Sequence, residues 1–203
     1  YLLEESGYLA EIMRQEYAEL NLSQSPRIIH SREARDALQL IRERQFDLVI
    51  TMARVGSMDV NAFGREVKSI ITDMPVILLS HNTRELATLH AGDGIDRIFV
   101  WTGDSRILLS ICKLIEDEKN VAYDVSDADV QVILLVEDSR RFYSAYLPLL
   151  YTQLVKQTTR LMGEGGNLEE KLLRLRARAK ILLATDMQSA RSIIDRYHNN
   201  IIG

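Results

Sequence analysis

Short apolar runs alternate with helix-forming segments along most of this chain, and this alternation is the feature that most restricts its fold. In the first half, residues 46–51, 75–80 and 95–100 are strand-like, and helical spacing of apolar residues follows each of them, the last over 105–120. Strands that alternate with helices form parallel sheets covered on both faces. The pattern therefore predicts an α/β protein with a parallel sheet.

Helices are also predicted over 8–20 and 33–44, with a short strand at 27–30 between them, because Pro26 can lie neither inside a helix nor in a central strand. Before the helix that ends near Ile71, residues 54–59 are predicted to form an irregular loop.

The alternation resumes after a polar break. Residues 124–129, DVSDAD, have no apolar period, so we predict a linker there, between a first domain over 1–123 and a second over 130–203. The run 130–136 has the continuous apolar character of a buried parallel strand. A long helix is predicted over 140–162, followed by a break at 163–166 and a second helix over 168–178. A strand over 180–185, a helix over 187–197 and the start of another strand at 201–203 are predicted after them.

Composition limits the classes of function. The chain has 203 residues, 46% of them hydrophobic, and a formal net charge of -4, so it lacks the basic excess that nucleic acid or an anionic membrane attracts. Its single cysteine, Cys112, excludes an internal disulfide framework and agrees with a reducing compartment. No apolar run approaches the roughly 20 residues of a membrane helix. We therefore expect a cytoplasmic protein that binds neither nucleic acid nor membrane.

The chain opens on Tyr1, close to a helix, and stops inside a strand-like segment. This suggests a piece of a longer protein, in which the first domain lacks its first strand and the second is represented by its amino-terminal part.

Several segments resemble the receiver domain of bacterial response regulators. FDLVITMARVGSMDV at 46–60 resembles its third strand and following loop, PVILLS at 75–80 its fourth strand, and RIFVWTG at 97–103 its fifth strand. VILLVEDS at 132–139 resembles the first strand of a second receiver. The resemblance implies tandem units with a flavodoxin-like, doubly wound parallel sheet, which binds ligands at the carboxyl ends of its strands.

The first unit departs from the receiver pattern where phosphorylation would occur. The family's phosphoacceptor aspartate falls on Met52, whose thioether can neither carry a phosphoryl group nor bind a hard cation well. The family's lysine falls on Trp101 and its aromatic switch position on Ile98, while Ser80 retains the family's hydroxyl. The resemblance therefore implies a degenerate pseudo-receiver that cannot be phosphorylated on Asp.

Glu137 and Asp138 directly follow the apolar run that ends at Val136. Two adjacent carboxylates at the end of a strand can help to hold a water-rich magnesium site, as in a receiver. The alternative is that Asp138 or Ser139 only caps the following helix. The sequence leaves both interpretations open, and the phosphoacceptor would belong to the strand that begins at Ile201.

Other chemically capable side chains lack a site pattern. The histidines have no metal-ligand spacing: His30, His81, His90 and His198. Three arginines near Glu169 and Glu170 are expected on a solvated helix face: Arg174, Arg176 and Arg178. The aromatic residues of the long helix are expected mostly to pack on the sheet, although such a helix also offers a surface for a dimer or another domain.

A second resemblance covers nearly the whole chain. The tandem units, the run RARAKILLAT and the start YLLEESGYLAEI are similar to the amino-terminal region of some bacterial phosphoenolpyruvate synthase or pyruvate phosphate dikinase-like proteins. In those proteins a nucleotide-binding and phosphotransfer portion follows. This chain has neither a nucleotide loop nor a phosphohistidine segment, so the resemblance gives it no activity of its own.

The expected function is a regulatory, receiver-type signalling module of a phosphorelay or of a larger phosphotransfer enzyme, and not an enzyme. The expected partners are a histidine kinase or phosphotransfer protein, downstream domains of the same chain, and a second copy of the chain. The alternative is a structural or oligomerisation module that positions a downstream phosphoenolpyruvate synthase-like catalytic region. A separate α/β enzyme is disfavoured, because no nucleophile with a nearby base is evident.

Overall fold

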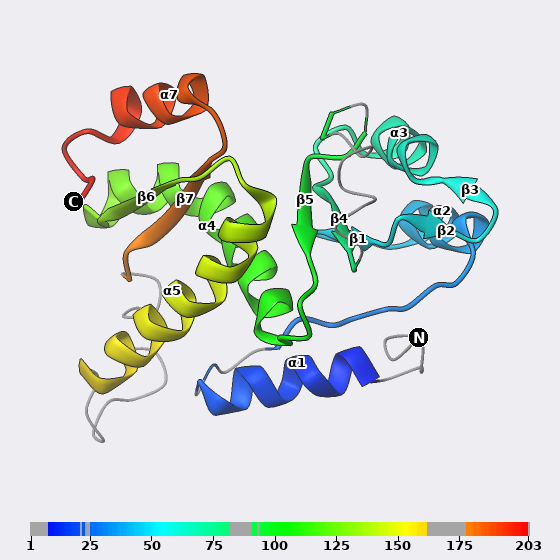
Figure 1. Cartoon of the computed structure of the whole chain (residues 1–203), viewed down its shortest axis with the longest axis horizontal. Coiled ribbons are helices and arrows are strands. Elements are labelled where there is room, and N and C mark those ends of the chain that lie inside the picture. Colours follow the sequence, from blue (N-terminus) through cyan, green and yellow to red (C-terminus); the bar gives the residue numbers. More distant parts are fainter. Residues whose placement is uncertain are drawn as a thin grey trace. The chain divides into compact units, whose positions relative to one another are not determined.

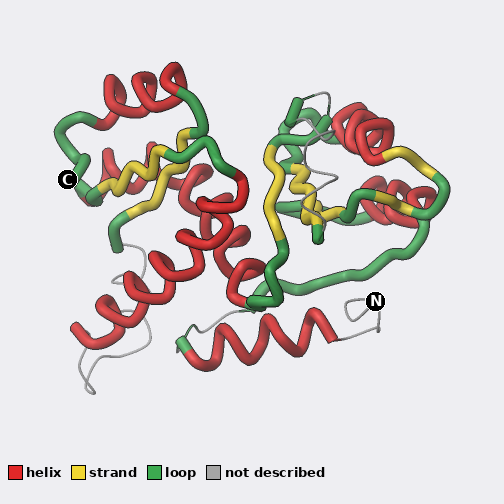
Figure 2. The backbone as a smooth tube through the Cα atoms, in the orientation of Figure 1, coloured by secondary structure: helices red, strands yellow, loops and turns green. Residues whose placement is uncertain are grey.

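The computed structural model describes residues 8–20, 22, 25–81, 91–92, 94–161 and 178–202 (Figures 1 and 2). The chain divides into two compact units. The first comprises Tyr1–Ala10 and Arg27–Asp104, and the second comprises Glu11–Pro26 and Ser105–Gly203. Both contain parallel strands and helices, so the predicted α/β class is confirmed.

The first unit contains a three-stranded parallel sheet in the order β1-β4-β5. These strands are β1 (Val49–Thr51), β4 (Val76–Ser80) and β5 (Arg97–Val100). All five residues of the central strand β4 are buried, as the continuous apolar run predicts. The three predicted strands are therefore confirmed, with shorter bounds, whereas residues 27–30 are described without a strand.

Two helices pack on this sheet, α2 (Ala34–Glu43) and α3 (Val60–Ile70). Their apolar residues share one core with side chains from β4 and β5: Leu38, Ile41, Phe63, Val67, Val76, Leu78 and Ile98. Val76 and Leu78 alternate along β4, so they point to the same face of the sheet. The helices therefore lie against that face.

The loop predicted over 54–59 is a short antiparallel hairpin instead. Its strands are β2 (Arg54–Val55) and β3 (Met58–Asp59), and Gly56 in the turn has a φ of 60°. Such two-residue turns favour glycine because L-residues rarely adopt positive φ. Asp59 then begins α3, because its carboxylate accepts hydrogen bonds from the backbone N–H groups of Asn61 and Ala62 at 3.0 and 3.1 Å.

The second unit contains the parallel strands β6 (Val132–Val136) and β7 (Lys180–Ala184). On its other edge, β6 forms a parallel bridge from Val132 to Ile201. The Val132 N–H donates to the Asn200 carbonyl at 2.8 Å, and the Ile202 N–H donates to the Val132 carbonyl at 3.0 Å. The predicted strand start at 201–203 therefore pairs with the sheet, and β6 lies between β7 and Ile201.

The helices of this unit are α4 (Arg106–Ala128), α5 (Arg140–Leu161), α7 (Met187–Tyr197) and, from Glu11 onward, α1 (Tyr8–Glu19). One core cluster joins α4, both strands and α7: Val121, Val132, Leu182 and Tyr197. The break predicted at 163–166 and most of the helix predicted at 168–178 lie outside the described residues. No helix in the described part of the chain could cross a membrane.

The predicted linker at 124–129 is almost entirely helical. α4 continues to Ala128 and ends at Asp129, which has a φ of 50°. The boundary between the compact units that precedes α4 lies between Asp104 and Ser105. The sequence pattern did not predict this part of the helix, because its acidic residues interrupt the apolar period. Asp124, one of them, forms an ion pair with Lys180 of β7. The helix predicted to end at 120 is therefore eight residues longer.

Candidate functional site

The carboxyl end of β6 carries the acidic pair that the sequence singled out. The Glu137 N–H donates to the Ala184 carbonyl at 3.0 Å, so the ladder between β6 and β7 extends to this residue. Glu137 is half-buried, and its Oε1 accepts the Ser139 N–H at 2.9 Å. Asp138 is exposed. Glu137 thus shapes the turn into α5, while the Asp138 carboxylate faces solvent.

The strand order reverses at this pair. After β6 the chain forms β7 on one edge of β6 and then reaches Ile201 on the opposite edge. In open parallel sheets, ligands bind outside the carboxyl ends of the strands where the order reverses, because the two connections leave in opposite directions. Glu137 and Asp138 lie at such a position.

These two carboxylates fit an open magnesium site better than a closed metal centre. No cluster of three or more metal-ligating residues occurs within the described ranges. Magnesium keeps several waters and is commonly bound through one or two carboxylates, so two acidic residues are a sufficient protein contribution. Glu137, and not Asp138, accepts the Ser139 N–H, and this contact lies in the turn before α5, so the helix-cap alternative stays a prediction.

The neighbouring strand β7 also ends near a carboxylate that the sequence analysis did not single out. Asp186 precedes α7 and accepts the Ser189 N–H at 2.7 Å. This hydrogen bond from the backbone lowers the pKa of Asp186. Asp186 is therefore a helix cap, and the sequence signal for it was an aspartate directly before a predicted helix, where this residue type is preferred.

In the first unit, three of the degenerate receiver positions lie at the carboxyl ends of adjacent strands. Met52 directly follows β1, Ser80 is the last residue of β4, and Trp101 directly follows β5. The Trp101 N–H donates to the Ser80 carbonyl at 2.8 Å. The fourth position, Ile98, is buried in the hydrophobic core and takes no part in this edge.

An aromatic pair occupies the same edge of the first unit. The rings of His81 and Trp101 meet edge to face with their centroids 6.0 Å apart. Burial lowers the pKa of His81, which favours the neutral imidazole. Thioether, hydroxyl and aromatic groups therefore lie at this edge, and none of the three side chains Met52, Ser80 and Trp101 is charged.

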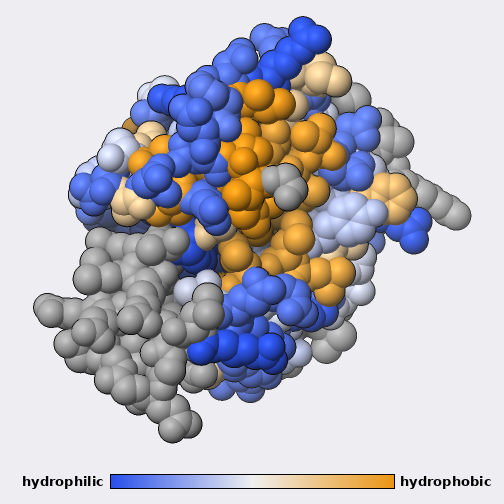
Figure 3. Space-filling model, turned by 90° about the vertical axis from the view of Figure 1, so that its left-hand side faces the viewer, coloured by the Kyte–Doolittle hydropathy of each residue, from blue (hydrophilic) through white to orange (hydrophobic). Residues whose placement is uncertain are grey.

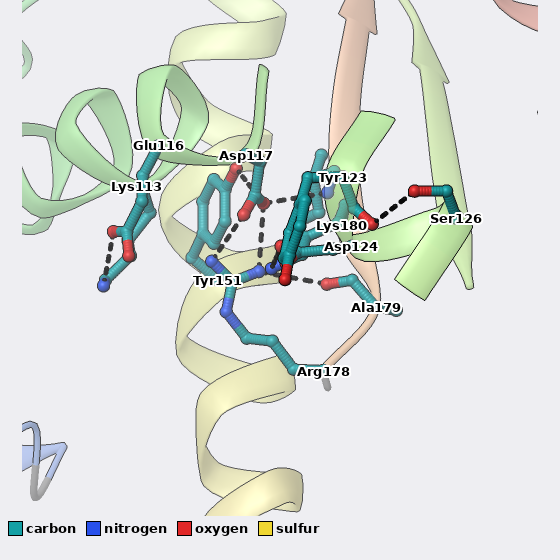
Figure 4. A network of polar contacts seen from close by, with 11 residues as sticks. Lys113, Glu116, Asp117, Tyr123, Asp124, Ser126, Tyr151, Arg178, Ala179 and Lys180 are labelled. Atoms are coloured by element: carbon teal, nitrogen blue, oxygen red, sulfur yellow. Dashed lines mark hydrogen bonds and ion pairs between the residues drawn. The ribbon is translucent and has the colours of Figure 1, made fainter. Parts of the chain in front are cut away.

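A buried polar cluster of the second unit is centred on Asp117 of α4 (Figure 4). Arg178 holds this carboxylate with two hydrogen bonds, from Nη1 to Oδ2 at 2.9 Å and from Nη2 to Oδ1 at 2.7 Å. The Tyr151 hydroxyl and the Ile181 N–H also donate to Oδ2, at 3.0 and 2.9 Å. One carboxylate thus joins α4, α5 and the beginning of β7.

The cluster is electrostatically balanced. Asp117 is completely buried, and an unpaired charge there would be costly, but the bidentate arginine compensates it. Burial alone would lower the pKa of Arg178, but the charge and hydrogen bonds of Asp117 outweigh burial and raise the pKa of Arg178. Burial, with the charge of Asp117, raises the pKa of Tyr151 well above its ordinary value. Tyr151 therefore remains a hydrogen-bond donor.

A second ion pair joins α4 to β7. The Lys180 Nζ lies 2.7 Å from the Asp124 Oδ2, and both side chains are largely buried. Asp124 follows Asp117 by seven residues, which is about two helical turns, so both acids lie on one face of α4. The prediction that Arg178 lies on a solvated helix face was wrong. The sequence signal for these ion pairs was the seven-residue spacing of Asp117 and Asp124, which places two acidic residues on one face of the helix.

The helix α1 contacts α4 through different residues. Tyr17 is buried and lies under the Lys113 ammonium group, with 5.5 Å between Nζ and the ring centroid. The Ser105 hydroxyl donates to the Glu16 carboxylate.

Burial raises the pKa of Cys112 to about 11, so this thiol stays protonated and is no nucleophile.

Hydrophobic side chains also reach the surface of the second unit. The face of the molecule in Figure 3 carries a broad area of hydrophobic surface. On α5, Phe142, Tyr146 and Leu149 are 50%, 42% and 53% exposed and follow one another at helical spacing. The rings of Phe142 and Tyr146 stack, with centroids 6.0 Å apart. We call these three residues the α5 stripe.

Comparison with known proteins adds no relative: the chain matches no protein-family model, no curated protein and no solved structure.

Proposed function

We propose that this chain is a regulatory, receiver-type signalling module with one phosphorylatable and one degenerate unit. The observation that carries the proposal is the reversal of strand order at β6, with Glu137 and Asp138 at its carboxyl end. A phosphoryl-accepting receiver needs a cation-binding acidic pair at that position. In the first unit, uncharged side chains, Met52 and Trp101, directly follow the described strands β1 and β5.

The strand orders of the two units support the finer, flavodoxin-like assignment. A doubly wound sheet of this type has the order 2-1-3-4-5. In the second unit, the order β7-β6-Ile201 corresponds to 2-1-3, with β6 as the first strand. In the first unit, the order β1-β4-β5 corresponds to 3-4-5. Each unit thus contains a different part of the proposed strand order.

Magnesium is the cofactor of the proposed reaction, and its contribution would be to neutralise negative charge on the incoming phosphoryl group. Asp138 is the better-placed ligand, because it is exposed and Glu137 already accepts the Ser139 N–H. Glu137 would orient the turn and hold a water of the cation's shell. The acceptor aspartate of this proposal belongs to the strand that begins at Ile201, and a histidine kinase or phosphotransfer protein is the proposed donor.

The deciding experiment is the intact mass of the full-length protein after incubation with acetyl phosphate and magnesium. We expect one added phosphoryl group, and its loss when Glu137 and Asp138 are changed together to Gln and Asn. A matched control changes Asp59 to Asn, which removes an acidic helix cap in the first unit and should leave phosphorylation intact. Absence of added mass in the unchanged protein, under conditions that phosphorylate a known receiver, would overturn the proposal.

A second candidate function is favoured by the α5 stripe. Exposed apolar side chains in a row are typical of assembly surfaces, so the chain could be a structural or oligomerisation module that positions a downstream phosphoenolpyruvate synthase-like region. Sedimentation velocity of the chain tests this. The candidate requires an oligomer that dissociates when all three stripe residues become Ser, and that persists when the exposed neighbour Arg141 becomes Ser. A monomer at high concentration would remove it.

A further inference from the structure

We draw no further inference here: the strongest candidate, the exposed apolar stripe of Phe142, Tyr146 and Leu149 along α5, is a helix face for which nothing in the described part of the structure shows what covers it.

Discussion

The two units of this chain place different chemistry at the carboxyl ends of their parallel strands. In the first unit, Met52 and Trp101 lie at the ends of the strands on either side of the fully buried central strand β4. In the second unit, Glu137 and Asp138 follow β6, whose residues are mostly only half-buried. An α/β unit keeps its fold when its strand-end residues change, because these residues contribute little to the core. Function can therefore differ between two units of the same α/β class.

The units also differ in how their elements are joined. In the described part of the first unit, a hydrophobic cluster joins α2, α3 and the strands β4 and β5. The second unit adds two largely buried ion pairs, Asp117 with Arg178 and Asp124 with Lys180. A buried pair stabilises weakly compared with apolar packing, but it is costly to break from one side. The second unit should thus be the more sensitive to single changes of charge.

The largest expected effect is on this buried network. Replacing Asp117 with Ala leaves the Arg178 guanidinium buried without its partner and should lower the stability of the second unit by about 3–5 kcal/mol. Amide hydrogen exchange checks this: protection should fall in β7 and α5 and remain in β4. The control, Glu116→Ala, removes a half-exposed partner of Lys113 on the same helix and should cost about 1 kcal/mol or less. Equal losses from both changes would contradict the comparison.

In the first unit, the feature expected to be sensitive to a single substitution is a close steric contact at Gly64. A Cβ on Gly64 of α3 would lie 2.5 Å from the carbonyl oxygen of Gly94, so the helix approaches this turn more closely than alanine permits. Gly64→Ala should therefore destabilise the first unit by about 1–3 kcal/mol, although alanine normally favours a helix. Chemical denaturation should show this loss, and Ser69→Ala on the exposed face of α3 should not. A stabilised Gly64→Ala variant would show that the turn moves away freely.

The chemical difference between the units is tested by magnesium itself. Changing Asp138 to Asn in the full-length protein should weaken magnesium binding about tenfold, which corresponds to roughly 1.4 kcal/mol, because one charged ligand is lost. Changing Met52 to Leu should leave binding unchanged. Isothermal titration calorimetry with magnesium chloride measures both. Equal affinity in the unchanged protein and in the Asp138 variant would remove the proposed site.

The smallest expected effect concerns the helix cap at the end of β7. The pKa of Asp186 is lowered in the folded state, so its contribution to stability is present above the ordinary carboxyl pKa of about 3.9 and is lost as the pH falls through the lowered value. Asp186→Ala should slightly destabilise the protein at neutral pH and have little effect near pH 2. Urea unfolding at both pH values measures this. The reverse pH dependence would show that Asp186 is not the cap.

Much of the fold followed from hydrophobic pattern. Five continuous or β-branched apolar runs predicted β1, β4, β5, β6 and β7, because strands of a covered parallel sheet require such runs. β4 and β7 are fully buried as expected, whereas β1 and β6 are only partly buried. The end of α4 and the hairpin β2–β3 could not be predicted in this way. Asp124 and Asp127 interrupt the apolar period, and a two-residue hairpin is too short to show alternation.

The sequence by itself determined the α/β class, the position of the acidic pair after β6 and the uncharged side chains of Met52 and Trp101 after β1 and β5. Only the tertiary structure decided that Arg178 is buried against Asp117, 61 residues away, and that β6 lies between β7 and Ile201. The physical reason is that periodicity reports which face of an element meets apolar surroundings. The pairing of charges and strands depends on which distant segments meet, and that information is absent from any local window.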